Sequence, residues 1–186
     1  MIMGLGIFTP LAIAGAIFFT VHNMIAKTNT FLVAGLISKL KGTFYLKDIG
    51  GLFKKNPALA ILFIIPAFAL AGIPPLSGFF AKFILIKAGI EDKHYIITTI
   101  AILTSMLTLY SMIKIWNEAF LKKQPDNKKT NQGMKLKFVD MLPSVLLGLA
   151  SIGLGLFAAQ FFDLAFQAAN QLLHPENYIR TVLLVK

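Results

Sequence analysis

Four long stretches without a charged side chain restrict this 186-residue chain to very few folds. Each stretch approaches or exceeds the roughly 20 apolar residues that a helix needs to cross a bilayer. Because backbone polar groups in lipid must be satisfied within the protein, the stretches predict an all-α integral membrane protein with about four transmembrane helices. The stretches are 1–26, interrupted only by His22, then 57–81, 95–113 and 141–162.

The second apolar region contains a sequence that a continuous helix cannot accommodate. The region covers about 56–90, or roughly 50 Å of helix, which is long for one span. Gly72, Pro74, Pro75 and Gly78 interrupt it, because each proline removes a backbone donor and each glycine favours irregular backbone. The region therefore either crosses the membrane twice, turning at the prolines, or crosses once as two half-helices.

The distribution of positive charge decides between these two topologies. The formal net charge is +10, and lysines cluster in two loops, 39–55 and 122–137. Short lysine-rich loops favour the cytoplasmic face, and only a single broken span leaves both loops on one face. We therefore predict the broken span, with both loops cytoplasmic and nucleic acid excluded as a partner. The predicted helices are about 11–40, 56–90 (broken near 73–78), 95–121 and 138–166, within one membrane domain, 1–186.

Lysines within the predicted spans are the main candidates for a functional site. Lys82 follows the break directly, and an ionisable group at that depth indicates function by default. Lys27 lies in the first span on one helical stripe with Thr20, Asn23 and Thr30. The alternative for Lys27 is a side chain that snorkels to the membrane surface.

His22 and two threonines of the third span are weaker candidates. His22 titrates near neutrality, so it could handle protons or form a structural hydrogen bond between helices. Thr104 and Thr108 share a face that could line a hydrated wall, although such hydroxyls often bond to their own helix. The chain has no cysteine, no clustered metal ligands and no nucleophile–base set. We therefore expect no metal, no cofactor and no catalysis by this chain.

Two segments resemble a known family. Residues 15–32, with His22 and Lys27, are similar to a family helix that carries histidine and then lysine. Residues 70–83, with Ala-Gly-Ile-Pro-Pro-Leu-Ser-Gly-Phe before Lys82, resemble that family's broken helix with its terminal lysine. The family is the D subunit of the Mrp-type multisubunit Na+/H+ antiporters, which is related to the antiporter-like subunits of NADH:quinone oxidoreductase and of membrane-bound hydrogenases.

This resemblance implies a fold and a mechanism. The family fold has two inverted repeats, each with a half-channel, joined by a central row of lysines, histidines and glutamates. By resemblance, Lys82 is the lysine where protons enter or leave, and Lys27 with His22 relays protons towards it. Asn23 stands where relatives often carry a second histidine. The chain resembles the C-terminal portion of such a subunit, without the first repeat.

The expected function is therefore a proton-translocating subunit of a Na+/H+ antiporter, working with other subunits, protons, Na+ and the lipid bilayer of the cell membrane. One alternative is a proton-pumping membrane subunit of NADH:quinone oxidoreductase or of a membrane-bound hydrogenase. The other is a truncated, non-conducting structural subunit whose polar residues only hold helices together.

Overall fold

A computed structural model describes residues 1–124, 136–176 and 179, and this part of the chain contains helices but no strand. Three helices are long and apolar enough to span a membrane: α2, α6 with the π-helical turn that follows it, and α7. The helices are α1 (Ile2–Ile7), α2 (Pro10–Lys41), α3 (Leu52–Lys55), α4 (Pro57–Ala71), α5 (Ser77–Glu91), α6 (Tyr95–Trp116), α7 (Phe138–Leu156) and α8 (Ala158–Leu173). These helices confirm the all-α membrane fold.

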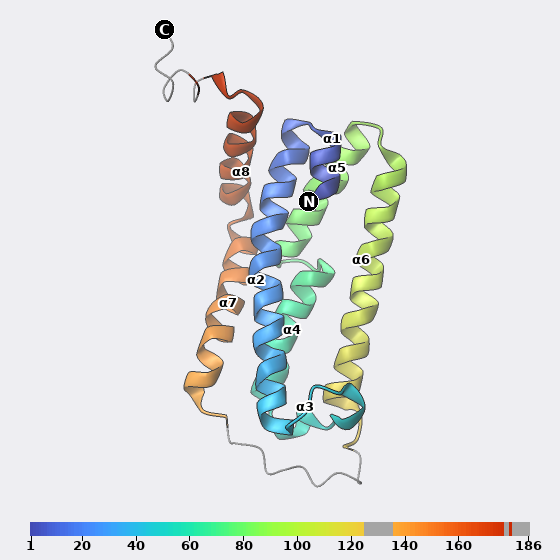
Figure 1. Ribbon diagram of the computed structural model, residues 1–186, viewed down its shortest axis with the longest axis vertical. Helices are drawn as coiled ribbons and strands as arrows, with labels where there is room; N and C mark the ends of the chain where they lie inside the picture. The colour runs from blue at the N-terminus through green and yellow to red at the C-terminus, as the bar shows by residue number, and fades with distance from the viewer. Residues whose placement is uncertain (125–135, 177–178, 180–186) are drawn as a thin grey trace.

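Helix α2 is the centre of the bundle, and α6 packs on α4 and α5. It begins with Thr9, whose hydroxyl accepts a hydrogen bond from Ala12 N (3.3 Å), and with Pro10 in the first turn. It ends at Gly42, which adopts the left-handed conformation (φ 71°) that terminates many helices. Between these residues it contacts α1, α4, α5, α7 and α8, as Figure 1 illustrates. Its 32 residues exceed the hydrocarbon thickness, so it extends beyond the membrane core at its ends.

The predicted broken span is confirmed. Helix α4 ends at Ala71, α5 begins at Ser77, and the five residues between them are irregular. Gly72 has φ 87°, a conformation that costs other residues energy, and the Pro74–Pro75 peptide bond is cis. In Figure 1, α4 and α5 follow one another along one course beside α2, as two half-helices of a single crossing.

Both lysine-rich segments meet at one end of the bundle, the lower end in Figure 1. Lys39 at the end of α2 pairs with Asp140 at the start of α7 (Nζ–Oδ1 2.8 Å). Gly51 N donates to Lys122 O (2.7 Å), which joins the loop after α2 to the end of α6. This is the arrangement that the charge argument required, whereas the side of the membrane stays a prediction. Residues 125–135 of the second loop lie outside the described residues.

The fourth predicted span, 138–166, is two helices in the structure. Helix α7 ends at Leu156, and after a bend at Phe157 the helix α8 continues to Leu173. Gly153 and Gly155 weaken the helix just before the bend. Beyond it, Ala158, Ala165 and Ala169 pack in one buried cluster with α2 residues, so α8 follows the surface of α2. Small side chains on α8 therefore set its direction, which the apolar pattern alone did not reveal.

We predict that Gly155→Ala destabilises the fold while Gly153→Ala does not. A Cβ at Gly155 would collide with Pro75 O and lie 3.0 Å from Ser77 N, both in or beside the break. The same Cβ at Gly153 would meet nothing within 4 Å. We expect Gly155→Ala to cost about 1–3 kcal/mol through overpacking, and Gly153→Ala to be neutral or to stabilise by up to about 1 kcal/mol. Thermal unfolding in detergent measures both, and equal melting temperatures would contradict the close packing of α7 on the break.

Candidate functional site at the helix break

At the break, each free backbone carbonyl at the end of α4 accepts a hydrogen bond from a nearby donor. The last four carbonyls of a helix have no partner within it. Here Phe68 O accepts from Gly72 N (2.9 Å) and from Ile73 N (3.0 Å), and Ala69 O accepts from Gly72 N (3.1 Å). The two remaining carbonyls accept from the Lys82 ammonium, with Nζ 2.8 Å from Leu70 O and 3.1 Å from Ala71 O. The predicted lysine therefore completes the end of the half-helix.

Lys82 reaches these carbonyls by folding back over Gly72. A Cβ at Gly72 would lie 3.0 Å from Lys82 Cδ, so a larger residue would crowd the lysine side chain. The carboxyl end of a helix carries partial negative charge, which favours a cation at this position. The ammonium is thus bound by dipoles and not by a carboxylate, because among the described residues its hydrogen-bond partners are the two carbonyls.

His22 lies beside the start of α5 and is almost completely buried, with 1% of its surface exposed. Its Nδ1 is 2.8 Å from Ser77 Oγ, and Ser77 Oγ is 3.2 Å from Ser151 Oγ. This chain of polar groups joins α2, the first residue of α5 and α7. A Cβ at Gly78 would lie 2.8 Å from His22 Cε1 and would collide with Ala69 O, so glycine makes room for the imidazole.

A pocket of about 180 Å³ opens beside Lys82. Thr104 and Thr108 of α6 line it, as the sequence suggested for a hydrated wall, together with Phe19 and Ser105. Both threonine hydroxyls donate to their own helix, at 2.8 Å to Ile100 O and to Thr104 O respectively. Their oxygens can still accept a hydrogen bond from a group in the pocket. The threonines can therefore bond to their own helix and also form a polar lining.

Lys27 is not part of this cluster. It lies five residues after His22, which is about 140° around the helix, and its side chain is exposed. Among the described residues it has no hydrogen-bond or ion-pair partner. Thr20 donates to Ala16 O of its own helix (2.7 Å), and Asn23 is half-buried. The predicted polar stripe thus faces away from the break, and the relay from Lys27 to Lys82 stays a prediction.

Sequence reasoning missed a second polar contact between α2 and α7. Asn29 and Ser144 are each 1% exposed, and Ser144 Oγ donates to Asn29 Oδ1. The signal was available as matched spacing: His22 and Asn29 are seven residues apart on α2, and Ser144 and Ser151 are seven apart on α7. Residues seven apart share a helix face, so the two pairs meet when the helices run antiparallel.

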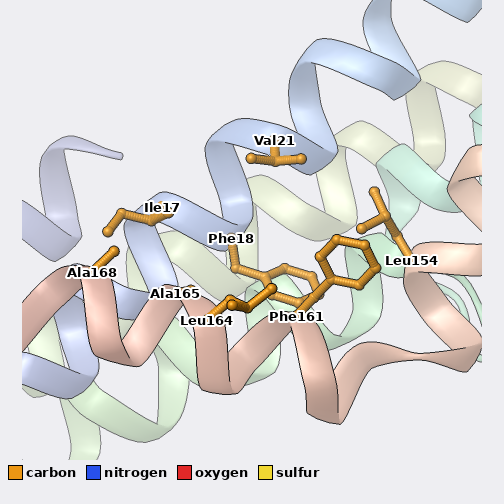
Figure 2. A pocket seen from close by; sticks show the side chains of 8 residues that line it. All are labelled: Ile17, Phe18, Val21, Leu154, Phe161, Leu164, Ala165 and Ala168. Carbon is orange, nitrogen blue, oxygen red and sulfur yellow. The ribbon is translucent and has the colours of Figure 1, made fainter.

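Two further observations limit what the site can do. Among the described residues, no group of three His, Cys, Asp or Glu side chains could hold a metal ion. A separate pocket of about 180 Å³ between α2 and α8 is lined entirely by apolar side chains. Figure 2 shows Phe18 and Phe161 at its centre, with Val21 and Leu154 beside them. That pocket offers no group that could relay a proton.

We predict that Ser77→Ala destabilises the protein more than Ser111→Ala. Ser77 is the hydrogen-bond partner of buried His22, whereas Ser111 is exposed and donates only to Leu107 O of its own helix. Hydrogen bonds between membrane helices contribute about 0.6 kcal/mol on average and up to about 1.7 kcal/mol. We expect a loss in this range for Ser77→Ala and a smaller change for Ser111→Ala, measured by reversible unfolding in detergent or bicelles. Equal losses would show that the contact with His22 contributes nothing to stability.

Comparisons with known proteins identify the family of this chain. Residues 1–108 match the model of the family described as "NADH:quinone oxidoreductase/Mrp antiporter, TM". The chain is 47% identical over 184 residues to the D subunit of the Na(+)/H(+) antiporter of Alkalihalophilus pseudofirmus, and 37% identical over 182 residues to that of Bacillus subtilis. These alignments cover 98% of this chain but 37% and 36% of the relatives. The chain therefore spans little more than a third of the length of these relatives.

A solved structure shows the same fold. A chain of the Mrp complex from Dietzia sp. DQ12-45-1b superposes with a TM-score of 0.87 at 28% identity. The match covers 97% of this chain and 41% of that one. The family match includes His22, Lys27 and Lys82 together with the break between them. The chain therefore belongs to the NADH:quinone oxidoreductase/Mrp antiporter transmembrane family, and within it resembles the D subunit of the antiporters.

Proposed function

We propose that this chain forms part of a proton-translocating subunit of a monovalent cation/proton antiporter that exchanges Na+ for H+. The observation that carries the proposal is the Lys82 ammonium, which is bound by two carbonyls at the end of the first half-helix of a broken membrane span, while buried His22 bonds Ser77 at the start of the second half-helix. The two relatives at 47% and 37% identity are named as antiporter D subunits, which favours an antiporter over a pumping subunit of NADH:quinone oxidoreductase.

The chemistry of Lys82 suits a group that gains and loses a proton. Its hydrogen-bond partners are neutral, so no carboxylate among the described residues fixes it in the charged state. The adjacent pocket, with Thr104 and Thr108, gives a route by which water could reach the ammonium. His22, with its Nδ1 bonded to Ser77, would exchange a proton through its other ring nitrogen.

Lys27 would act as a second proton carrier on the exposed face of α2. A charged amine near the middle of a 32-residue span cannot remain against lipid, so this face of α2 requires protein or water around it. In the proposed antiporter that environment comes from other parts of the assembly. Other subunits, the lipid bilayer of the cell membrane, protons and Na+ are the proposed partners, and the lysine-rich end is proposed to face the cytoplasm.

The first functional prediction concerns Lys82. Lys82→Ala in the assembled complex should lower coupled Na+/H+ exchange by about a hundredfold or more, which is the size typical of a lost proton-transfer group. Lys87→Ala should retain exchange, because Lys87 is exposed and pairs with Glu91 at 3.7 Å. Exchange is measured in everted membrane vesicles with a pH-sensitive dye, and assembly is checked by co-purification.

The outcome also separates transport from a purely structural role. A non-conducting structural subunit would tolerate Lys82→Ala wherever the complex still assembles. Exchange at the parental rate in assembled Lys82→Ala complex would therefore remove Lys82 from the pathway, and with it the proposed mechanism.

The second functional prediction concerns Lys27. Because Lys27 is exposed on α2 and unpaired among the described residues, Lys27→Ala should leave the packing of these helices unchanged while it slows exchange in complex that still assembles. Lys27→Arg should not restore the rate, since arginine remains protonated and cannot pass on a proton. A full rate in Lys27→Ala, or full rescue by arginine, would mean that Lys27 is not a proton carrier.

A further inference from the structure

The lysine-rich end contains a groove that the transport proposal does not use. It lies between α2, the loop that follows α2, and α6, and encloses about 170 Å³. We call it the basic-end groove, and the residues that define it here are Thr30, Ala34, Ile37, Phe44, Leu46 and Ile115. Most of these side chains are apolar, so the groove suits a hydrocarbon ligand better than an ion.

The face of α2 that lines the groove continues to a lysine beyond it. Thr30, Ala34, Ile37 and Lys41 follow one another at intervals of four, three and four residues, which places them on one helix face. The distance along the helix from Lys41 to Thr30 is roughly 16 Å, about half of the hydrocarbon core. The face of α2 from Thr30 to Lys41 is therefore about as long as one leaflet is thick.

Positive charge is concentrated beside the groove, where Lys41 bonds Gly50, the chain neighbour of the lining residue Ile49. Lys41 and Lys55 both donate to Gln124 Oε1, at 3.0 and 2.9 Å, so two ammonium groups converge on one neutral oxygen. Lys41 also donates to Gly50 O (3.1 Å). Two like charges held this close repel each other, and an anion near them would offset the repulsion.

Acidic residues at this end do not balance the lysines. Residues 39–55, 114–124 and 136–140 contain nine lysines and three carboxylates. Asp140 pairs with Lys39 (2.8 Å), and Glu118 pairs with Lys122 (2.9 Å). At the opposite end, residues 87–95 contain two lysines and two carboxylates. Between these two ends of the described structure, the excess of positive charge is therefore at the end with the groove.

The loop beside the groove has the composition of a membrane interface. Phe44 and Tyr45 are 73% and 77% exposed and stand next to Lys47, whereas Ile49 and Leu52 are buried and anchor the loop to the bundle. Aromatic side chains gather at the level of lipid headgroups, and lysines near them attract anionic lipids. The loop is therefore held at the depth where a lipid headgroup would lie.

We propose that the basic-end groove is a binding site for an anionic phospholipid. One acyl chain occupies the groove along Ala34 and Ile37, and the phosphate lies between the ammonium groups of Lys41 and Lys55. A free phosphate ion would bind the lysines and leave the groove empty. An apolar protein helix would fill the groove and leave the charge of the lysines uncompensated. A phospholipid satisfies both. The proposal is independent of the proposed transport function.

The headgroup part is tested by the lipid retained on the purified complex, detected by native mass spectrometry. The probes are phosphatidylglycerol and phosphatidylcholine with the same acyl chains. Lys41→Gln/Lys55→Gln should lower retained phosphatidylglycerol by about fivefold for each lysine, and phosphatidylcholine much less. The control is Lys54→Gln/Lys123→Gln, two exposed lysines of the same end. An equal loss in the control, or no loss in the first pair, would overturn the site and leave a diffuse basic surface.

The acyl-chain part is tested by filling the groove. Ala34→Phe should displace the lipid, whereas Gly35→Phe, at a position where a Cβ would meet nothing within 4 Å, should not. Ala34→Leu serves as a smaller substitution if phenylalanine prevents assembly. Complete displacement of phosphatidylglycerol by millimolar inorganic phosphate would indicate a simple anion site and overturn the proposal. So would capture of a protein, in place of lipid, by a photo-crosslinker at position 34 in native membranes.

Discussion

The structure depends on the satisfaction of the carbonyls that the break in the α4–α5 span leaves free. In lipid, each unsatisfied carbonyl costs several kcal/mol, so a helix can stop in mid-membrane only where donors are supplied. Gly72 and Ile73 supply backbone donors, and Lys82 supplies the remainder from the other half-helix. The lysine that is proposed to carry the proton is thus also a structural part of the break.

The close packing around the break follows from the same requirement. Irregular backbone has to be covered by protein, and glycines allow the neighbouring helices to approach it. Gly155 brings α7 against Pro75 and Leu76, and Gly78 lets α5 pass beside His22 and Ala69. The hydroxyls of Ser77 and Ser151 then lie close enough to join three helices through His22.

Features that depend on local chemistry could be predicted from the sequence. Two adjacent prolines between glycines must break a helix. A lysine that follows a long uncharged stretch within a membrane span indicates a functional or structural role. The positions of the two lysine-rich loops then selected the broken span. The contacts of α2 could not be predicted in this way, because α2 is apolar on most sides and carries two polar stripes. One stripe contains Thr20, Asn23 and Lys27, and the other contains His22 and Asn29. The second is buried because Asn29 meets Ser144 of α7 and His22 meets Ser77 of α5, which in turn lies beside Ser151 of α7. Only the matched seven-residue spacing pointed to these contacts in advance.

The double role of Lys82 constrains how the proposed transport can work. A protonated lysine can donate three hydrogen bonds, and a neutral one can still donate two. Loss of the proton therefore need not release Leu70 O or Ala71 O, and the break can keep its shape. What changes is the attraction between the charge and the carboxyl end of α4, which carries partial negative charge. The charge state of Lys82 thus alters the electrostatics of the break without unfolding it, as a carrier that releases and rebinds protons repeatedly requires.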